Sequence, residues 1–170
     1  FTVDDDLTDF PVLVDITDSD LRIYALSSGD DVVFTDTNGF KLSHEIEFYD
    51  GVSGHLIAWV NVPLLSSTED TILYMYFGNT DATNQEDPAG TWNNNYAMVQ
   101  HLDETSGTHN DSTSYANHGT PSVTTQGSAP GRINGADEFD GVDDYLQTNT
   151  TMNSSEDMSF ALWVKYSSLS

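Results

Sequence analysis

The stretch that decides the fold is Val32-Val33-Phe34-Thr35-Asp36-Thr37-Asn38-Gly39-Phe40-Lys41-Leu42-Ser43-His44-Glu45-Ile46-Glu47-Phe48-Tyr49. Asn38 and Gly39 stand between two apolar runs, and both residue types tolerate the positive φ that a type I′ turn requires. In the return run, apolar and polar residues alternate with a period of two, which is typical of a half-buried strand. The stretch therefore predicts an antiparallel hairpin, with its return strand over residues 42–49.

The same period of two recurs on both sides of this hairpin. Residues 56–62 form a strongly apolar run that Pro63 closes, because proline has no amide donor. Residues 72–77 are apolar or aromatic throughout, which predicts a central strand covered on both faces. We therefore expect residues 1–80 to fold as an antiparallel β-sandwich. Its first strand would carry Phe10, Val12, Val14 and Ile16 on one face.

The rest of the chain predicts a second β-unit. Residues 81–97 have the composition of a linker, and residues 98–170 form a unit with few apolar residues before its last run. No later strand follows that run to cover it, and an uncovered apolar strand favours aggregation. We expect it to be covered by a further C-terminal part of the same chain, or by a strand from a neighbouring subunit. Its apolar face comprises Met158, Phe160, Leu162, Val164 and Tyr166.

Composition narrows the range of partners. The chain has 170 residues, 28 acidic and 4 basic, for a formal net charge of −24. Such a charge repels phosphate backbones and anionic lipids, which argues against nucleic-acid and membrane-surface partners. It favours cationic partners, divalent ions or a high-salt medium. With no cysteine, the chain has no disulfide and no thiolate site, and no apolar run is long enough to span a bilayer.

The stretch Phe139-Asp140-Gly141-Val142-Asp143-Asp144-Tyr145 holds the best candidate cation ligands. Calcium takes six to eight oxygen ligands, which loops rich in carboxylates and carbonyls supply. We expect a calcium site from Asp140, Asp143 and Asp144, together with Asp103 and Glu104 from the start of the same unit. Asp111 is a further candidate ligand. The alternative is that Asp140 and Gly141 form a turn that Asp143 caps.

Glu45 and Glu47 are the one pair of candidate catalytic carboxylates. They share a face of one strand about 6.7 Å apart, and glycosidases use two carboxylates at roughly 5–9.5 Å. The alternative is a solvated polar face opposite Ile46 and Phe48. No nucleophile elbow occurs, and the five histidines show no close spacing typical of metal ligands.

Two further sets of residues suggest carbohydrate. Trp92 lies in polar sequence and is the candidate platform for stacking on a sugar ring, whereas Trp59 and Trp163 lie in strand-like runs and are expected in the core. Three glycosylation sequons are also present. They begin at Asn110, Asn149 and Asn153.

Two groups of motifs resemble known families. Leu7-Thr-Asp-Phe-Pro-Val-Leu-Val14, His44-Glu-Ile-Glu-Phe-Tyr-Asp50, Ala58-Trp-Val-Asn-Val-Pro63 and Tyr74-Met-Tyr-Phe-Gly-Asn79 resemble an uncharacterised family of secreted prokaryotic β-domains. His101-Leu-Asp-Glu-Thr-Ser-Gly107, Asp111-Ser112, Phe139-Asp-Gly-Val-Asp-Asp-Tyr145 and Ser159-Phe-Ala-Leu-Trp-Val-Lys165 resemble the N-terminal half of a laminin-G-like, concanavalin A-like jelly roll. The resemblance implies an all-β chain, a β-sandwich unit followed by a partial jelly roll, at a prokaryotic cell surface.

The sequence therefore favours a non-catalytic extracellular module that acts in assembly, of filaments or other surface polymers, or in adhesion. Its partners would be other subunits or surface proteins, through strand addition at residues 158–166. The main alternative is a calcium-dependent carbohydrate-binding module, and a weaker one is a fragment of a glycoside hydrolase that uses Glu45 and Glu47.

Overall fold

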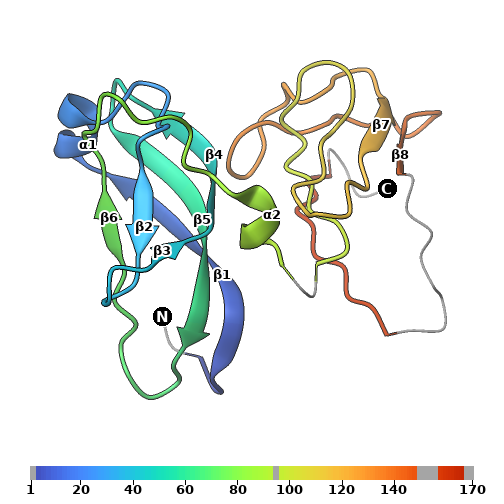
Figure 1. Cartoon of the computed structure of the whole chain (residues 1–170). Helices are drawn as coiled ribbons and strands as arrows, with labels where there is room; N and C mark the ends of the chain where they lie inside the picture. Colours follow the sequence, from blue (N-terminus) through green and yellow to red (C-terminus); the bar gives the residue numbers. More distant parts are fainter. Residues whose placement is uncertain (1–2, 94–95, 149–156, 167–170) are drawn as a thin grey trace.

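A computed structural model describes residues 3–93, 96–148 and 157–166 of the chain. The described chain is nearly all β, with antiparallel strands, as the sequence predicts (Figure 1). Its two helices are short: α1, Ser19–Tyr24, and α2, Pro88–Thr91. None of the described helices could cross a bilayer. The strands are β1, Leu7–Thr17; β2, Val33–Thr35; β3, Lys41–Leu42; β4, His44–Asp50; β5, His55–Leu65; β6, Tyr74–Tyr76; β7, Gly119–Ser122; and β8, Tyr145–Thr148.

Two three-stranded sheets form the N-terminal β-sandwich. One has the order β1-β5-β4 and the other β3-β2-β6. β5 is the long central strand of the first sheet and pairs with β1 along almost its whole length. Apolar side chains from both sheets and from α1 meet between them and drive folding by leaving water. The buried core consists of Leu21, Val32, Phe34, Leu42, Leu56, Ala58 and Val60.

The hairpin predicted around Asn38 and Gly39 is confirmed, but the predicted type I′ turn is wrong, because Asn38 does not take the positive φ that this turn type requires. β2 pairs with β3, Gly39 has φ 83°, and the Asp36 carboxylate accepts the amides of Asn38 and Phe40. The return run differs from the prediction, because it is not one strand. The chain leaves the second sheet at Ser43 and enters the first as β4, where the Ser43 carbonyl accepts the Asn61 amide.

The prediction of a central strand over residues 72–77 is wrong. β6 covers only three of these residues and lies at the edge of its sheet, with β2 as its neighbour. An edge strand leaves one side open, and Tyr74 and Tyr76 are accordingly 47% and 56% exposed. Composition alone suggested burial on both faces, but Leu73, Met75 and Phe77 are the residues of this run that pack against the core.

The stretch expected to be a linker is anchored on the first sheet. Asp87 caps α2 by accepting the Gly90 amide, and its own amide donates to the His44 carbonyl. The Asn61 side chain donates to the Thr91 carbonyl. Residues 87–91 are therefore held against β4 and β5 by polar contacts.

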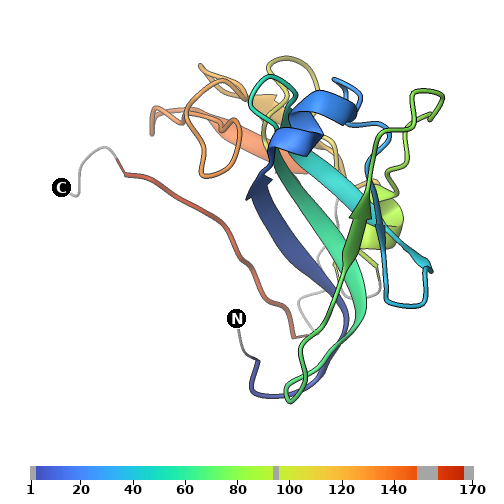
Figure 2. The same ribbon diagram turned by 90° about the vertical axis from the view of Figure 1, so that its left-hand side faces the viewer.

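The second half of the chain carries little regular structure. β7 and β8 pair antiparallel, and the buried Asp111 carboxylate organises residues 97–118 by accepting the amides of Val99, Thr113 and Asn117. Residues 157–166 form no strand, contrary to the prediction. They run as an exposed extended segment apart from the sheets (Figure 2), and none of the described strands pairs with them.

Candidate functional site

The two glutamates of β4 lie where the two halves of the chain meet. Alternation along β4 places His44 on the core side and Glu45 on the opposite face of the sheet. A β-bulge after Ile46 locally shifts the register with β5, and Glu45 lies opposite Trp59. Residues of the second half cover this outer face. The side chains of Glu45 and Glu47 are only 12% and 8% exposed.

Glu45 accepts hydrogen bonds from three elements of the second half. One carboxylate oxygen, Oε2, accepts from Trp92 Nε1 at 2.5 Å and lies 3.1 Å from His101 Nε2. The other, Oε1, accepts from Ser112 Oγ at 2.6 Å. Glu45 thus connects β4 to Trp92, His101 and Ser112, which lie 47, 56 and 67 positions later in the sequence.

Glu47 contacts the other side of the same histidine. Its Oε1 lies 3.4 Å from His101 Nδ1, and its Oε2 accepts from Trp59 Nε1 at 2.5 Å. The Asn134 side chain donates to its backbone carbonyl. We call Glu45, Glu47, His101, Trp92 and Ser112 the junction cluster.

Both ring nitrogens of His101 face a carboxylate, an arrangement that a doubly protonated, positively charged ring satisfies. Burial alone would lower the pKa of His101. Its hydrogen bonds to Glu45 and Glu47, and the negative charges of the two glutamates, outweigh this effect and raise the pKa to about 10. Burial likewise acts to raise the pKa of Glu45, but the His101 contact and the other donors lower it. The cluster is therefore a buried cation between two anions.

This geometry suits a structural contact that fixes the second half of the chain to the sheet better than a pair of catalytic carboxylates. A glycosidase needs one carboxyl group that carries a proton and another that reaches the substrate or a water. Here all four carboxylate oxygens of Glu45 and Glu47 are held by donors of the chain itself. The predicted solvated face is also wrong, because residues 92–134 cover it.

A second buried histidine organises the C-terminal half. His109 is fully buried, with Nδ1 2.7 Å from Glu104 Oε2 and Nε2 2.9 Å from Asp137 Oδ2. Glu104 also accepts the Asn110 amide, and Asp137 accepts the Gly127 amide. His109 thus contacts Glu104, five positions earlier in the chain, and Asp137, 28 positions later.

The five predicted calcium ligands separate into two groups. Asp140, Asp143 and Asp144 each place one carboxylate oxygen within 4.8 Å of the others at the surface. Asp103 and Glu104 do not join them, because Glu104 contacts His109 and Asp103 accepts from Asn134. The predicted turn is present as well: the Asp140 carboxylate accepts the Val142 amide, while Asp144, rather than Asp143, accepts the Asp140 amide. The further candidate, Asp111, is used within its own loop.

The predicted sugar platform is wrong. Trp92 is only 6% exposed, packs against Trp59 and Tyr96, and uses its indole N–H on Glu45. It therefore presents no ring face to a ligand. Conversely Trp163, expected in the core, is 80% exposed. Asn110 is exposed, as a glycosylated residue must be, and Asn149 and Asn153 lie outside the described residues.

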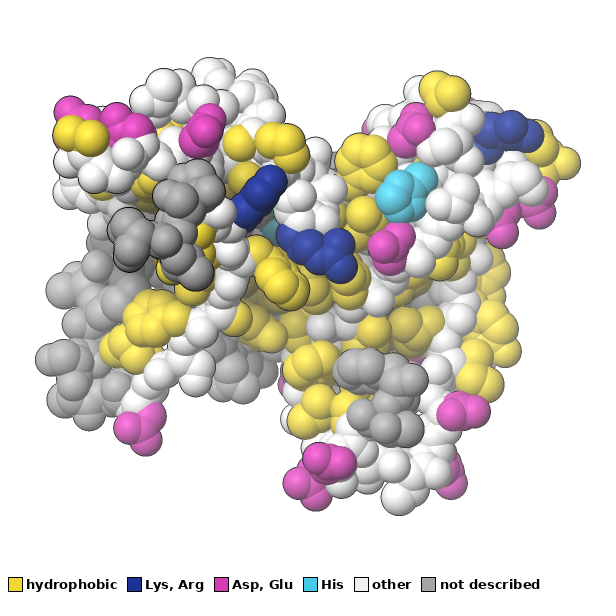
Figure 3. Space-filling view, turned by 180° about the vertical axis from the view of Figure 1, so that it is seen from behind, with side chains coloured by type: hydrophobic (Ala, Val, Ile, Leu, Met, Phe, Trp, Pro, Cys, Tyr) yellow, Lys and Arg dark blue, Asp and Glu magenta, His cyan; other side chains and the backbone are white. Residues whose placement is uncertain are grey.

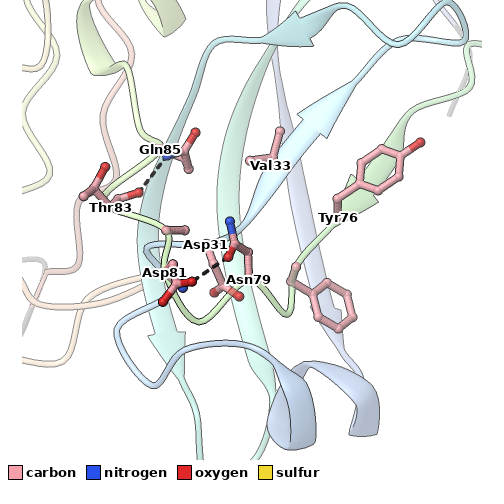
Figure 4. Close-up of a pocket in the computed structure, with 9 residues that line it drawn as sticks. Asp31, Val33, Tyr76, Asn79, Asp81, Thr83 and Gln85 are labelled. Atoms are coloured by element: carbon pink, nitrogen blue, oxygen red, sulfur yellow. Dashed lines mark hydrogen bonds between the residues drawn. The ribbon is translucent and has the colours of Figure 1, made fainter.

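A polar groove of about 360 Å³ lies at the end of β6 (Figure 4). Asp31, Asn79, Asp81, Thr83 and Gln85 line it. The Asp31 carboxylate is buried and already accepts the amides of Leu26 and Gly78, so it orders the loops around the groove. The ring of Tyr76 points away from the polar side chains (Figure 4). Phe77 also lines the groove and packs against the core of the sandwich.

Sequence reasoning missed the role of His101, Ser112 and Asn134. The pairing of Glu45 with a residue 56 positions away follows from how the second half folds over the sheet, and no local pattern reports it. The available signal was the pair of glutamates itself, since alternation predicted that they share one face.

Comparison with known proteins gives one family. A family model described as "Domain of unknown function (DUF2341)" matches residues 28–120, more than half of the chain. The match runs from the loop before β2 to β7 and includes every residue of the junction cluster. No curated protein and no solved structure matches.

Proposed function

The chain belongs to the DUF2341 family of unknown function, and from this premise we propose that it is a non-catalytic extracellular module that acts in assembly or adhesion at a cell surface. Its binding element is the extended segment of residues 157–166. The β-sandwich and the loops locked onto it form the rigid body that presents this segment.

The exposed apolar side chains of residues 157–166 carry this proposal. Six large apolar side chains of this segment are between 46% and 80% exposed. Fully burying one such side chain contributes about 1.5–3 kcal/mol. A contiguous apolar surface of this kind marks an interaction site on a soluble protein. The six residues are Met158, Phe160, Leu162, Trp163, Val164 and Tyr166.

The engagement of Glu45 and Glu47 supports a non-catalytic role. They are the strongest catalytic candidates in the sequence, and three of their four carboxylate oxygens contact residues of the second half, while the fourth accepts from Trp59. The net charge of −24 and the exposed Asn110 sequon support a secreted surface protein, and the absence of cysteine is compatible with one. The antiparallel pair β7 and β8 is compatible with residues 98–170 being part of a laminin-G-like jelly roll.

Size-exclusion chromatography with light scattering tests the proposal. We expect the 18.7 kDa chain to form larger species in a concentration-dependent way, and the double variant Phe160→Ser, Leu162→Ser to remain monomeric. The reason is that this variant removes two of the six exposed apolar side chains and introduces polar groups that an interface would have to desolvate.

The matched control is the double variant Val52→Ser, Val142→Ser. Both valines are 84% exposed but lie outside residues 157–166, so this variant should associate as the unmodified chain does. Equal association of both double variants would refute a role for the segment.

Calcium binding is the second candidate function, favoured by the grouping of Asp140, Asp143 and Asp144. A cation there would make residues 139–145 part of a calcium-dependent carbohydrate-binding loop. Free calcium at a hundredfold above its dissociation constant adds about 2.7 kcal/mol to the free energy of unfolding, so the melting temperature should rise at millimolar calcium. The Asp143→Ala variant should lose this rise, and Asp70→Ala, an exposed aspartate elsewhere, should keep it. No rise in the unmodified chain would remove this candidate.

A further inference from the structure

The β1 strand offers an open backbone edge. β1 lies at the end of the order β1-β5-β4, and among the described strands it pairs with β5 alone. The Asn61 amide of β5 donates towards β4, so the backbone amides and carbonyls of the odd-numbered residues of β5 point towards β4. The backbone groups of the residues in β1 that lie opposite them therefore point away from β5. Leu13, Asp15 and Thr17 therefore direct both amide and carbonyl outwards, and Pro11 directs its carbonyl.

The side-chain pattern of β1 matches that of residues 158–166. In β1 four half-buried apolar residues alternate on the core side, and one exposed apolar residue, Leu13, lies at the middle of the opposite face. In the segment four apolar residues alternate in the same way about Trp163. Both runs are symmetric about this central residue, so the match holds for parallel and antiparallel pairing. The core-side residues are Phe10, Val12, Val14 and Ile16 in β1, and Phe160, Leu162, Val164 and Tyr166 in the segment.

The charges of the two runs are complementary. β1 carries Asp9 and Asp15 and no basic residue, whereas residues 158–166 carry Lys165 and no acidic residue. Arg132 adds a second positive charge beside the segment, 5.8 Å from the ring of Trp163. Two of the four basic residues in the chain therefore lie at the segment, although the chain as a whole repels its copies.

We propose that residues 158–166 of one copy add as a strand to the β1 edge of a second copy, with Trp163 beside Leu13. This inference rests on the proposed assembly function and names its acceptor. The added strand would pair with the outward backbone groups of β1 and extend the apolar core past Val14 and Ile16. The apolar face of residues 158–166 is exposed on its own chain. On the rear surface of the molecule, hydrophobic side chains gather in the middle and acidic side chains lie mostly at the margin (Figure 3).

Disulfide trapping between two single-cysteine variants tests this pairing, because the chain has no cysteine of its own. Leu13→Cys is mixed with Trp163→Cys under mild oxidation, and the cross-linked heterodimer is measured by non-reducing electrophoresis. Directly opposed residues have Cβ atoms about 4.5–5.5 Å apart, close to the separation that a disulfide needs. We expect severalfold more heterodimer than from Val14→Cys with Trp163→Cys, since Val14 lies on the other face of β1.

The outcomes separate this inference from the proposed function. Association in light scattering without preferential cross-linking at Leu13 would overturn the β1 assignment and leave assembly standing. A chain that shows no association overturns both. Cross-linking within one chain that carries both cysteines, at high dilution, would overturn the second copy as the partner, because the segment would then fold back onto its own β1.

Discussion

Replacing Glu45 with alanine is expected to lower the free energy of unfolding by about 3–5 kcal/mol, the usual cost of removing one partner from a buried ion pair. The substitution leaves the buried His101 with one carboxylate where it had two. It also leaves Trp92 Nε1 and Ser112 Oγ without their acceptor, and each unpaired buried donor costs about 1–3 kcal/mol. These groups belong to the second half of the chain, so the loss should weaken its attachment to the sheet.

Urea unfolding measures this effect. The experiment is best done in the Phe160→Ser, Leu162→Ser background, because association of the folded chain would add to its apparent stability. Glu69→Ala is the matched control, since Glu69 is exposed and such surface changes usually stay within about 0.5 kcal/mol. A Glu45→Ala variant as stable as Glu69→Ala would show that the junction cluster contributes little.

The free energy of unfolding is expected to fall as the pH rises from 6.5 towards 10, because His101 loses its proton across this range. Folding raises the pKa of His101 from 6.5 to about 10, so the folded chain binds the proton more tightly than the unfolded chain. The stabilisation is complete below pH 6.5 and disappears as the pH approaches the folded value. At 1.36 kcal/mol per pKa unit, it amounts to roughly 3–5 kcal/mol.

Urea midpoints measured between pH 6 and pH 10 test this prediction. In the His101→Gln variant, most of the fall of the urea midpoint with rising pH should disappear. His55→Gln is the matched control: His55 also pairs with a carboxylate, Asp15 at 2.8 Å, but its side chain is 33% exposed. The fall should persist in His55→Gln. If the urea midpoint fell equally with rising pH in all three proteins, groups other than His101 would cause the loss of stability at alkaline pH.

Acidic pH should weaken the fold through a different residue, His44. Burial in the core lowers the pKa of His44, and this effect outweighs the backbone of Leu42 and Val32, which acts to raise it. A group with a lowered folded pKa contributes stability that is lost as the pH falls below its unfolded value of 6.5. His44 therefore begins to lower the free energy of unfolding as the pH falls below 6.5, where the stabilisation from His101 is already complete. We therefore expect the free energy of unfolding to be largest near neutral pH.

Local patterns determined how much of the fold could be predicted. The period of two, together with Asn38 and Gly39, was enough to predict antiparallel strands and the hairpin, because these depend on neighbours in sequence. The switch between sheets at Ser43 and the edge position of β6 depend on which strands pair across the sandwich. No property of residues 72–77 distinguishes an edge from a centre.

The site was harder to predict than the fold for the same reason. The sequence identified Glu45 and Glu47 as a pair, but their chemistry is set by His101, Trp92 and Ser112, which fold over them from the second half. Trp92 looked exposed because its neighbours in sequence are polar. The family match covers residues 28–120, a range that includes both glutamates and the residues that contact them.

Sedimentation velocity of the unmodified chain is the most direct test of assembly. The net charge of −24 opposes association at low salt, and salt screens this repulsion while leaving apolar contacts intact. We expect species heavier than the 18.7 kDa chain, whose share grows with protein concentration and with salt. A single 18.7 kDa species at every protein and salt concentration would refute the proposed assembly.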